Sequence, residues 1–238
     1  MSMSNFGKIY SQIERANPSL IAQFKELGVS TIYESMVEET LMDPSITPIC
    51  KGQIIAGSAV TAINTPGDNL SMHLGLSLTQ PGDILVTAFL GTHSYNALWG
   101  EMATLAGIGR KISGVIADGA VRDVKAILDN QFPVWAKSIS SKTSSVEKIG
   151  GINVPAVCGG VLVNPGDIIV ADDDGAVVIP LEQAEEVLQK AQKRAEREKE
   201  IKGLLLQGKT PYEIFNMGIA LEKNEIPIIN DKYDSRKV

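Results

Sequence analysis

The sequence predicts an α/β domain with helices at both ends of the chain and short strands between them. Short runs of apolar, often β-branched residues, separated by Gly, Pro and Asp, occupy residues 52–179. Such runs are typical of strands. Apolar residues at helical spacing occur before, within and after this region. With 238 residues and 44% hydrophobic composition, the chain is long enough to bury a substantial core.

The first segment, residues 3–39, is expected to be helical. The apolar residues at helical spacing are Ile9, Ile13, Leu20, Ile21, Phe24 and Leu27. Asn17–Pro18 interrupts the pattern, and Gly28 ends its second part. Ser30 is the expected N-cap of a further short helix that runs through Met36.

The middle of the chain alternates between expected strands and shorter helices. The expected strands are Gln53–Ile63, Asp83–Phe89, Ile112–Asp118, Pro133–Ile139, Gly160–Asp172 and Gly175–Pro180. The expected helices are Asn69–Leu78, Ala97–Ala106 and Val124–Leu128. Because several strands follow one another late in the chain, a strictly alternating parallel sheet is disfavoured.

One long helix is expected over residues 181–207. It carries an apolar stripe and two i,i+4 pairs, Glu186–Lys190 and Glu198–Lys202, and Gly208 follows it as a stop signal. No composition change divides the chain sharply, so a single domain is expected. Its parts are N-terminal helices 1–40, an α/β core 52–180, and a C-terminal helix and tail 181–238.

Composition excludes several classes of protein. The formal charge of −6 argues against a nucleic-acid-binding surface, which favours a basic balance. The N-terminus lacks the continuous apolar stretch of a signal peptide, and no run approaches the roughly 20 apolar residues that span a bilayer. Cys50 and Cys158 lie far apart and are expected to be buried thiols. We therefore expect a cytoplasmic protein that binds neither nucleic acid nor membrane.

Two acidic motifs are expected to be turns. Pro-Gly-Asp occurs three times, at Pro66–Asp68, Pro81–Asp83 and Pro165–Asp167. Proline and glycine provide the turn geometry, and Asp bonds local amides. Asp172–Gly175 looks like a cation-binding cluster, but it lies between two expected strands and ends in Gly. A tight hairpin turn is therefore the favoured interpretation.

The pair Arg122–Asp123 is the leading candidate for chemistry. It follows an expected strand and begins a short helix, and the end of a strand is where α/β sheets commonly bind ligands. Arg offers a charged planar fork for a carboxylate, and Asp offers a hard oxygen to a divalent cation. Taken alone, the pair is more typical of a surface helix whose first turn carries an acid.

Longer stretches of the chain resemble the RraA-like family. They are Pro66–Asn69, Pro81–Val86, Trp99–Glu101, Gly119–Val124, Phe132–Trp135 and Asn153–Pro180. The similarity is greatest to the branch of 4-hydroxy-4-methyl-2-oxoglutarate / 4-carboxy-4-hydroxy-2-oxoadipate aldolases. The family signature is an acidic residue, twenty intervening residues and then Arg-Asp. This chain has Glu101, twenty residues and Arg122–Asp123, although the family often has Asp at the first position.

The resemblance implies roles for these residues. Asp123 would bind the metal, magnesium or manganese, and Arg122 would bind the substrate's carboxylate or keto oxygen. A neighbouring subunit would contribute a glutamate from its long C-terminal helix, placed by spacing at Glu198 with Glu196 as the fallback. The turn that presents backbone amides to the pyruvyl carboxylate consists of Gly100, Glu101, Met102 and Ala103, and Glu101 would hold a metal-bound water.

The resemblance also implies the fold, assembly and activity. The fold would be a β/β/α swivelling-type domain, assembled as a homotrimer or homohexamer with sites between subunits. The activity would be class II cleavage of a 4-hydroxy-2-oxo acid to pyruvate, with oxaloacetate decarboxylation as a side activity. No lysine stands out as a Schiff-base former. His93 is a candidate pocket residue, whereas His73 is expected to be packed or capping.

The family leaves one alternative open. Some RraA-like proteins are non-catalytic regulators that bind an RNA-degrading endonuclease. Those regulators tend to lack the intact acid and Arg-Asp set and the long C-terminal helix, and both features are present in this chain. Which 4-hydroxy-2-oxo acid would be the substrate is not determined by the sequence.

Overall fold

The computed structural model describes residues 6–91 and 94–232. The strands are β1 Thr47–Pro48, β2 Ile55–Asn64, β3 Ile84–Phe89, β4 Ala97–Trp99, β5 Gly114–Val121, β6 Val134–Ile139, β7 Ile149–Ile152, β8 Ala156–Cys158, β9 Val161–Val163, β10 Ile168–Asp172 and β11 Gly175–Ile179. The helices are α1 Pro18–Lys25, α2 Val29–Tyr33, α3 Leu70–Leu78, α4 Glu101–Arg110, α5 Val124–Asp129, a 3₁₀ turn Leu181–Gln183, α6 Ala184–Leu206, α7 Pro211–Ile214 and α8 Gly218–Lys223.

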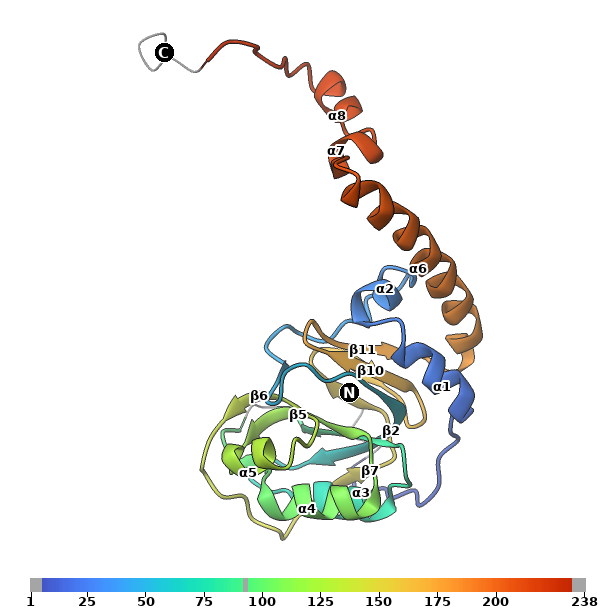
Figure 1. Ribbon diagram of the computed structural model, residues 1–238. Coiled ribbons are helices and arrows are strands. Elements are labelled where there is room, and N and C mark those ends of the chain that lie inside the picture. Colours follow the sequence, from blue (N-terminus) through green and yellow to red (C-terminus); the bar gives the residue numbers. More distant parts are fainter. Residues whose placement is uncertain (1–5, 92–93, 233–238) are drawn as a thin grey trace. The chain divides into compact units, whose positions relative to one another are not determined.

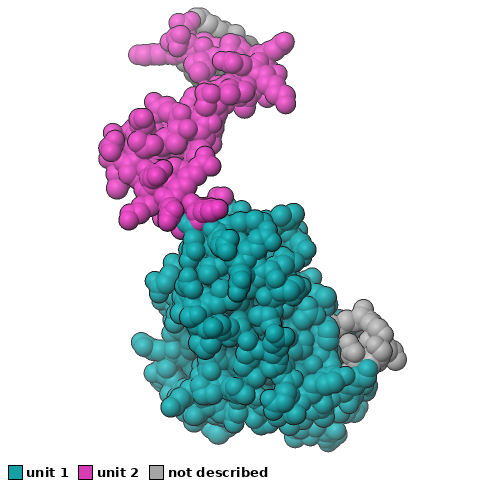
Figure 2. Space-filling view, turned by 90° about the vertical axis from the view of Figure 1, so that its right-hand side faces the viewer, with its two compact units in different colours: residues 1–192 teal, residues 193–238 magenta. Residues whose placement is uncertain are grey.

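Two compact units make up the chain, residues 1–192 and residues 193–238 (Figure 2). The expected organisation of the whole chain as one domain stays a prediction. Within the described ranges, no helix has both the length and the apolar character that crossing a membrane requires.

The first unit is built on a mixed sheet with the strand order β1-β6-β5-β3-β2-β10-β11. Strands β2, β3, β5 and β6 are parallel, whereas β10 pairs antiparallel with both β2 and β11. Helices α3, α4 and α5 connect the parallel strands, and α3 and α4 lie side by side (Figure 1). The α/β class is thus confirmed, and five of the six expected strands are present as single strands. The sixth, Gly160–Asp172, is divided by its Pro-Gly-Asp turn into β9, which pairs with β8, and β10, which joins the main sheet.

The expected helix Ala97–Ala106 begins later than its apolar spacing indicates. Ala97, Leu98 and Trp99 are buried and form β4, which pairs parallel with β5. Helix α4 starts only at Glu101, after Gly100 in extended backbone. Three consecutive buried positions suit a strand that is covered on both faces. This boundary is important because it puts the start of α4 beside the end of β5.

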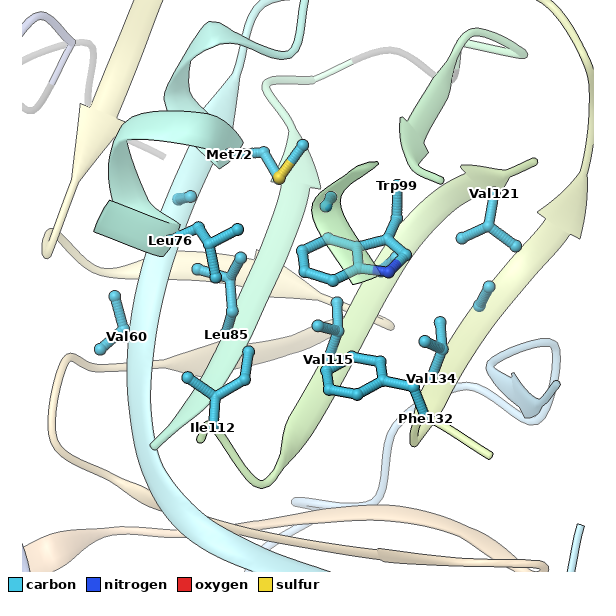
Figure 3. Close-up of a cluster of buried hydrophobic side chains, with 14 of the residues drawn as sticks. Val60, Met72, Leu76, Leu85, Trp99, Ile112, Val115, Val121, Phe132 and Val134 are labelled. Carbon is cyan, nitrogen blue, oxygen red and sulfur yellow. The ribbon is translucent and has the colours of Figure 1, made fainter. Parts of the chain in front are cut away.

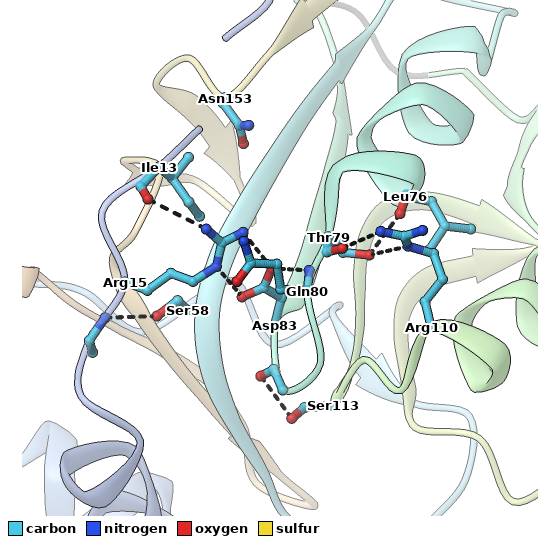
Figure 4. A network of polar contacts seen from close by, with 12 residues as sticks. Ile13, Arg15, Ser58, Leu76, Thr79, Gln80, Asp83, Arg110, Ser113 and Asn153 are labelled. Carbon is cyan, nitrogen blue, oxygen red and sulfur yellow. Dashed lines mark hydrogen bonds and ion pairs between the residues drawn. The ribbon is translucent and has the colours of Figure 1, made fainter. Parts of the chain in front are cut away.

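Helix prediction over residues 6–16 was wrong. This segment is extended, with Ile9 bridging Ile152. Arg15 then makes two hydrogen bonds to the buried carboxylate of Asp83, both 2.9 Å long (Figure 4). The apolar residues at helical spacing therefore lie in an extended segment, because partners far along the chain bond their backbone groups.

Helix α2 is capped differently from the prediction. Gly28, with φ of 77°, is its N-cap, and Ser30 lies inside the helix. The Val29 amide donates instead to Asp172 Oδ2 at 2.8 Å. Asp172, from the β10–β11 hairpin, thus accepts a first-turn amide of α2, as Ser30 was expected to do.

The three Pro-Gly-Asp motifs are turns, as predicted. Asp68, Asp83 and Asp167 are all buried, and each accepts hydrogen bonds from backbone amides. Asp83 and Asp167 both bond the amide three residues earlier, at 2.7 Å. Buried carboxylates require such partners, so the motif stabilises the sheet ends.

The core beneath α3 and α4 centres on Trp99, whose ring stacks on Phe132 with centroids 5.9 Å apart (Figure 3). The indole nitrogen donates to Thr104 Oγ1 at 2.8 Å, and that hydroxyl donates to Gly100 O at 3.0 Å. Trp99, which precedes Gly100, is therefore buried in the core and bonded through its indole to Thr104 of α4. Anchoring of this kind fixes the path of the chain through Gly100.

The long C-terminal helix is present, with Gly208 following it at φ of 92°. The pair Glu186–Lys190 is confirmed at 2.6 Å. Glu198 pairs with Arg194 at 2.9 Å, one turn back.

Candidate functional site

The candidate site lies where β4 and β5 end beside each other. Trp99 pairs with Val121, and the Arg122 amide donates to Trp99 O at 2.9 Å. The next residues of the two strands, Gly100 and Arg122–Asp123, therefore face one another. The two motifs that are separated by twenty residues in the sequence are brought together by this strand pairing.

The side chain of Asp123, at the start of α5, contacts the start of α4. Asp123 adopts the left-handed conformation, with φ of 55°, and does not cap its own helix. Its Oδ2 accepts the Glu101 amide at 3.1 Å and lies 3.4 Å from Arg122 Nε. A non-glycine residue in this region of backbone space is uncommon. The Asp123 carboxylate therefore bonds the start of α4, instead of acting only as an acid in the first turn of a surface helix.

Gly100 permits this close approach. A Cβ at this position would lie 2.7 Å from Asp123 Oδ2 and 3.0 Å from Arg122 Cγ. Real Cβ atoms do not approach neighbours so closely, so a side chain here would displace Asp123 or Arg122. The glycine is required for space, since its extended backbone suits any residue.

Arg122 projects into the cleft with a second anchor. Its Nη1 donates to Thr143 Oγ1 at 3.2 Å. The side chains of Arg122 and Asp123 are 40% and 41% exposed, so both remain accessible to a ligand. The sequence provided no signal for Thr143, which comes from the segment that follows β6.

The start of α4 adds backbone donors to the same cleft. The first intrahelical bond back to the turn is made by the Thr104 amide, which donates to Gly100 O at 3.0 Å. The amides of Met102 and Ala103, which precede it, have no intrahelical acceptor. Together with the helix dipole, such amides favour an anion at a helix N-terminus.

The cleft has a volume of about 140 Å³, and residues at the start of α3 also line it. They include Asn69, the N-cap of α3, and His73, one helical turn further along. His73 was expected to be packed or capping, but its side chain is exposed at the cleft. The surrounding chain removes part of its water, which lowers the pKa of the imidazole below its ordinary value.

The donor set fits an octahedral cation better than a closed structural metal site. The described residues contain no group of three or more His, Cys, Asp and Glu side chains able to hold a metal. Magnesium, however, keeps several waters and binds through one or two carboxylates together with oxygens of the substrate. Asp123 suits this role because both of its contacts use Oδ2, and no described residue donates to Oδ1.

The remaining predicted residues lie as follows. Glu101 is exposed at the first turn of α4. Glu198 belongs to residues 193–238, where it pairs with Arg194, and Glu196 is exposed on the same helix. His93 lies outside the described residues.

Comparisons with known proteins identify the family. The model of the RraA-like family, described as Aldolase/RraA, matches residues 29–178. The chain belongs to the RraA-like family. This RraA-like chain is 34% identical over 182 residues to a protein of Halalkalibacterium halodurans named "Putative 4-hydroxy-4-methyl-2-oxoglutarate aldolase", covering 76% of the chain and 86% of that protein. A protein of the same name from Aromatoleum aromaticum is 32% identical over 119 residues, covering 50% and 74%.

Solved structures of the family have the same fold. RraAS2 of Streptomyces coelicolor, described as an unusual member of the RNase ES inhibitor RraA protein family, superposes with a TM-score of 0.72 and 25% identity. That superposition covers 80% of this RraA-like chain and 99% of RraAS2. The RNA-processing inhibitor RraA of Thermus thermophilus superposes with a TM-score of 0.58 and 25% identity, covering 64% and 92%. The predicted fold is thereby confirmed.

Proposed function

We propose that the protein is a class II, divalent-metal-dependent aldolase. It cleaves a 4-hydroxy-2-oxo di- or tricarboxylic acid to pyruvate and a second keto acid. Oxaloacetate decarboxylation is its side activity. The observation that carries the proposal is the convergence of Arg122 and the first turn of α4 on one cleft, with the Asp123 carboxylate in contact with both. The aldolase names of two relatives support it.

The role of each group follows from its charge. The amides of Met102 and Ala103 hold the pyruvyl carboxylate, and Arg122 neutralises the 2-oxo oxygen as negative charge develops there. Asp123 holds magnesium or manganese, which when bound supplies a Lewis acid. Well-placed donors to a developing oxyanion commonly contribute a few kcal/mol each.

The 4-hydroxy-2-oxo acid and oxaloacetate give the same enolate, and the bond changes that follow its formation are the same. A general base takes the proton of the C4 hydroxyl, the C3–C4 bond breaks, and its electron pair forms the enolate of pyruvate while C4 becomes a carbonyl. Protonation of C3 then gives pyruvate, with Glu101 at the mouth of the cleft placed to orient the water that delivers the proton. Loss of carbon dioxide from oxaloacetate gives the same enolate.

A second copy of the chain completes the site in this proposal. The outer face of α4 beside the cleft is apolar, with Met102 68%, Leu105 47% and Ile108 43% exposed. An apolar helix face next to an incomplete donor set favours a subunit boundary. Glu198, with Glu196 as the fallback, is the glutamate that the neighbour would contribute in a homotrimer or homohexamer.

The alternative function is regulation of an RNA-degrading endonuclease without catalysis. The similarity to RraAS2, described as a member of an RNase inhibitor family, favours this alternative. Retention of Glu101, Arg122 and Asp123 favours the aldolase, because binding another protein requires no such set in a cleft.

The deciding experiment is a pyruvate assay on the purified protein. We expect release of pyruvate from 4-hydroxy-4-methyl-2-oxoglutarate and from oxaloacetate with magnesium, and loss of both activities when a chelator is added. The Arg122→Ala variant, which keeps the fold but lacks the guanidinium, is the matched control. Equal pyruvate release by wild type and Arg122→Ala would contradict the proposal.

A further inference from the structure

The imidazole of His73 lies at the cleft and takes no part in the hydrogen bonds of the fold. Its side chain is exposed, and it lines the same cavity as Gly100 and Arg122. Among the described residues, none forms a hydrogen bond or ion pair with its ring. A histidine that packs in a core or caps a helix is buried or hydrogen-bonded instead. Both ring nitrogens of His73 are therefore available to a ligand.

The core fixes the start of α3 beside the start of α4. Met72, which precedes His73, is buried in the same cluster as Trp99 (Figure 3). Trp99 in turn precedes Gly100, the N-cap of α4. Because successive side chains of a helix are about 100° apart, a buried Met72 leaves His73 directed to the exposed side of α3. The position of His73 is thus set by its buried neighbour.

A hydrogen bond connects α3 to the segment that anchors Arg122. The Asn69 amide donates to Ser145 O at 3.0 Å. Ser145 lies two residues beyond Thr143, which accepts the hydrogen bond from Arg122 Nη1. The cleft has a volume of only about 140 Å³. A 2-oxo acid held by Arg122 in so small a cleft therefore lies within reach of the imidazole.

The imidazole of His73 is suited to accept a proton. Partial removal of water lowers its pKa below the ordinary value, so the ring is neutral at physiological pH. The other charged side chains that line the cleft within the described residues are Arg122 and Glu101. Arg122 has no proton-accepting form at this pH. Glu101 is exposed at the first turn of α4 and orients water in the proposed mechanism, which leaves His73 to accept a proton from the substrate.

We propose that His73 is the general base that takes the proton of the C4 hydroxyl when the 4-hydroxy-2-oxo acid is cleaved. This rests on the proposed aldolase function and deepens it. As the proton moves to the ring nitrogen, the electrons of the O–H bond form the C4 carbonyl, the C3–C4 bond breaks, and its electron pair enters the enolate. The imidazolium then releases the proton to solvent, to which the side chain is exposed. Decarboxylation of oxaloacetate starts from a carboxylate and needs no base.

The test compares two substrates in one variant. In His73→Gln, we expect kcat/KM for 4-hydroxy-4-methyl-2-oxoglutarate to fall about 10²–10⁴-fold, the usual contribution of a positioned base. We expect oxaloacetate decarboxylation by the same variant to change less than about threefold, because its transition state uses no base. Ser77→Ala, at an exposed position of the same helix, is the matched control and leaves both activities unchanged.

The pH dependence separates a base from a residue that only binds the substrate. For the wild type, kcat/KM for cleavage should fall toward acid as His73 takes up a proton, at a pH below the ordinary pKa of 6.5. Decarboxylation should lack this acid limb. The chain has two histidines, so the ring C2 proton of His73 can be assigned in proton NMR by its loss from His73→Gln. Its titration should have the same midpoint as the limb.

The outcomes distinguish the base from the aldolase function. Equal losses on both substrates, no loss on either, or an acid limb that persists in His73→Gln would overturn the role of His73. So would a titration midpoint that differs from the limb. Each of these results leaves the aldolase proposal intact. A wild-type protein that acts on neither substrate would overturn the aldolase proposal and the general base with it.

Discussion

Two acidic turns of this chain are candidates for cation binding by sequence, and they differ in what their carboxylates do. Asp172–Asp174 is the richer cluster, yet its side chains bond other parts of the chain. Asp172 accepts the Val29 and Asp174 amides, and Asp173 accepts the Gly52 amide with both oxygens, at 2.9 and 3.0 Å. At the other turn, Asp123 uses one oxygen and leaves the second without a donor from the described residues.

The difference shows how to separate structural from functional acids. A carboxylate whose oxygens accept backbone amides stabilises the fold and has little capacity left for a cation. Asp123 is held in left-handed backbone by the pairing of β4 with β5, and it stands beside Arg122 and the start of α4. Four experiments can break or sharpen this comparison.

The largest expected difference in pyruvate formation is between Asp123→Ala and Asp173→Ala. Loss of the Asp123 carboxylate is expected to lower pyruvate formation by about 10²–10³-fold or more, because charge stabilisation at the reacting oxygens is lost. Asp173→Ala removes only a hairpin contact and should keep full activity. Similar activities of the two variants in a steady-state pyruvate assay would contradict the distinction between the turns.

Gly100→Ala against Gly109→Ala tests the close approach at the site. The added Cβ at Gly100 would lie 2.7 Å from Asp123 Oδ2, and a displacement near 1 Å can cost about 10²-fold in rate. At Gly109, on the same helix, an added Cβ meets nothing within 4 Å. That variant should retain activity and gain about 0.5–1 kcal/mol in stability. Activity and thermal melting, measured on both variants, check the two expectations.

Asp68→Ala should act on stability. Burial opposes ionisation of this carboxyl, but bonds from Ser145, Glu147, Leu70 and Lys148 outweigh it and lower its pKa. We expect a loss of about 3 kcal/mol at neutral pH in denaturant titrations. Since the folded pKa is lowered, this stabilisation is present above the unfolded value of 3.8 and is lost as pH falls through the folded pKa. A gap between wild type and variant that stays constant down to pH 2 would contradict it.

Thr143→Val should have the smallest effect. The substitution keeps the shape of the side chain and removes the acceptor of the 3.2 Å bond from Arg122 Nη1. Losing an accessible hydrogen bond of about 0.5–1.5 kcal/mol corresponds to a roughly two- to tenfold fall in kcat/KM. Thr143→Ser, which keeps the hydroxyl, should restore most of the rate, and its failure to do so would point to packing instead.

The sequence predicts the strands of the sheet and the order of its parts, because their β-branched runs and Pro-Gly-Asp turns are local signals. It does not predict the extended path of Ile9, which depends on Ile152 far along the chain. Nor does apolar spacing separate β4 from α4, since a buried strand and a buried helix turn share the same residues.

The same limit applies to the site. Arg122, Asp123 and Glu101 were identified by their spacing and family resemblance. Thr143 comes from a segment whose sequence carries no chemical motif of its own. Asn69 ends one of the family-like stretches, Pro66–Asn69, but only the structure places it at the cleft.

Formation of the pyruvate enolate tests the central proposal most directly, because it depends on neither leaving group. Exchange of the methyl protons of pyruvate in deuterium oxide can be followed by proton NMR, with magnesium, with chelator, and with Asp123→Ala. We predict exchange by the wild type that requires the cation and is lost in Asp123→Ala. Absence of cation-dependent exchange in the wild type, or its persistence in Asp123→Ala, would contradict an enolate site at Arg122–Asp123.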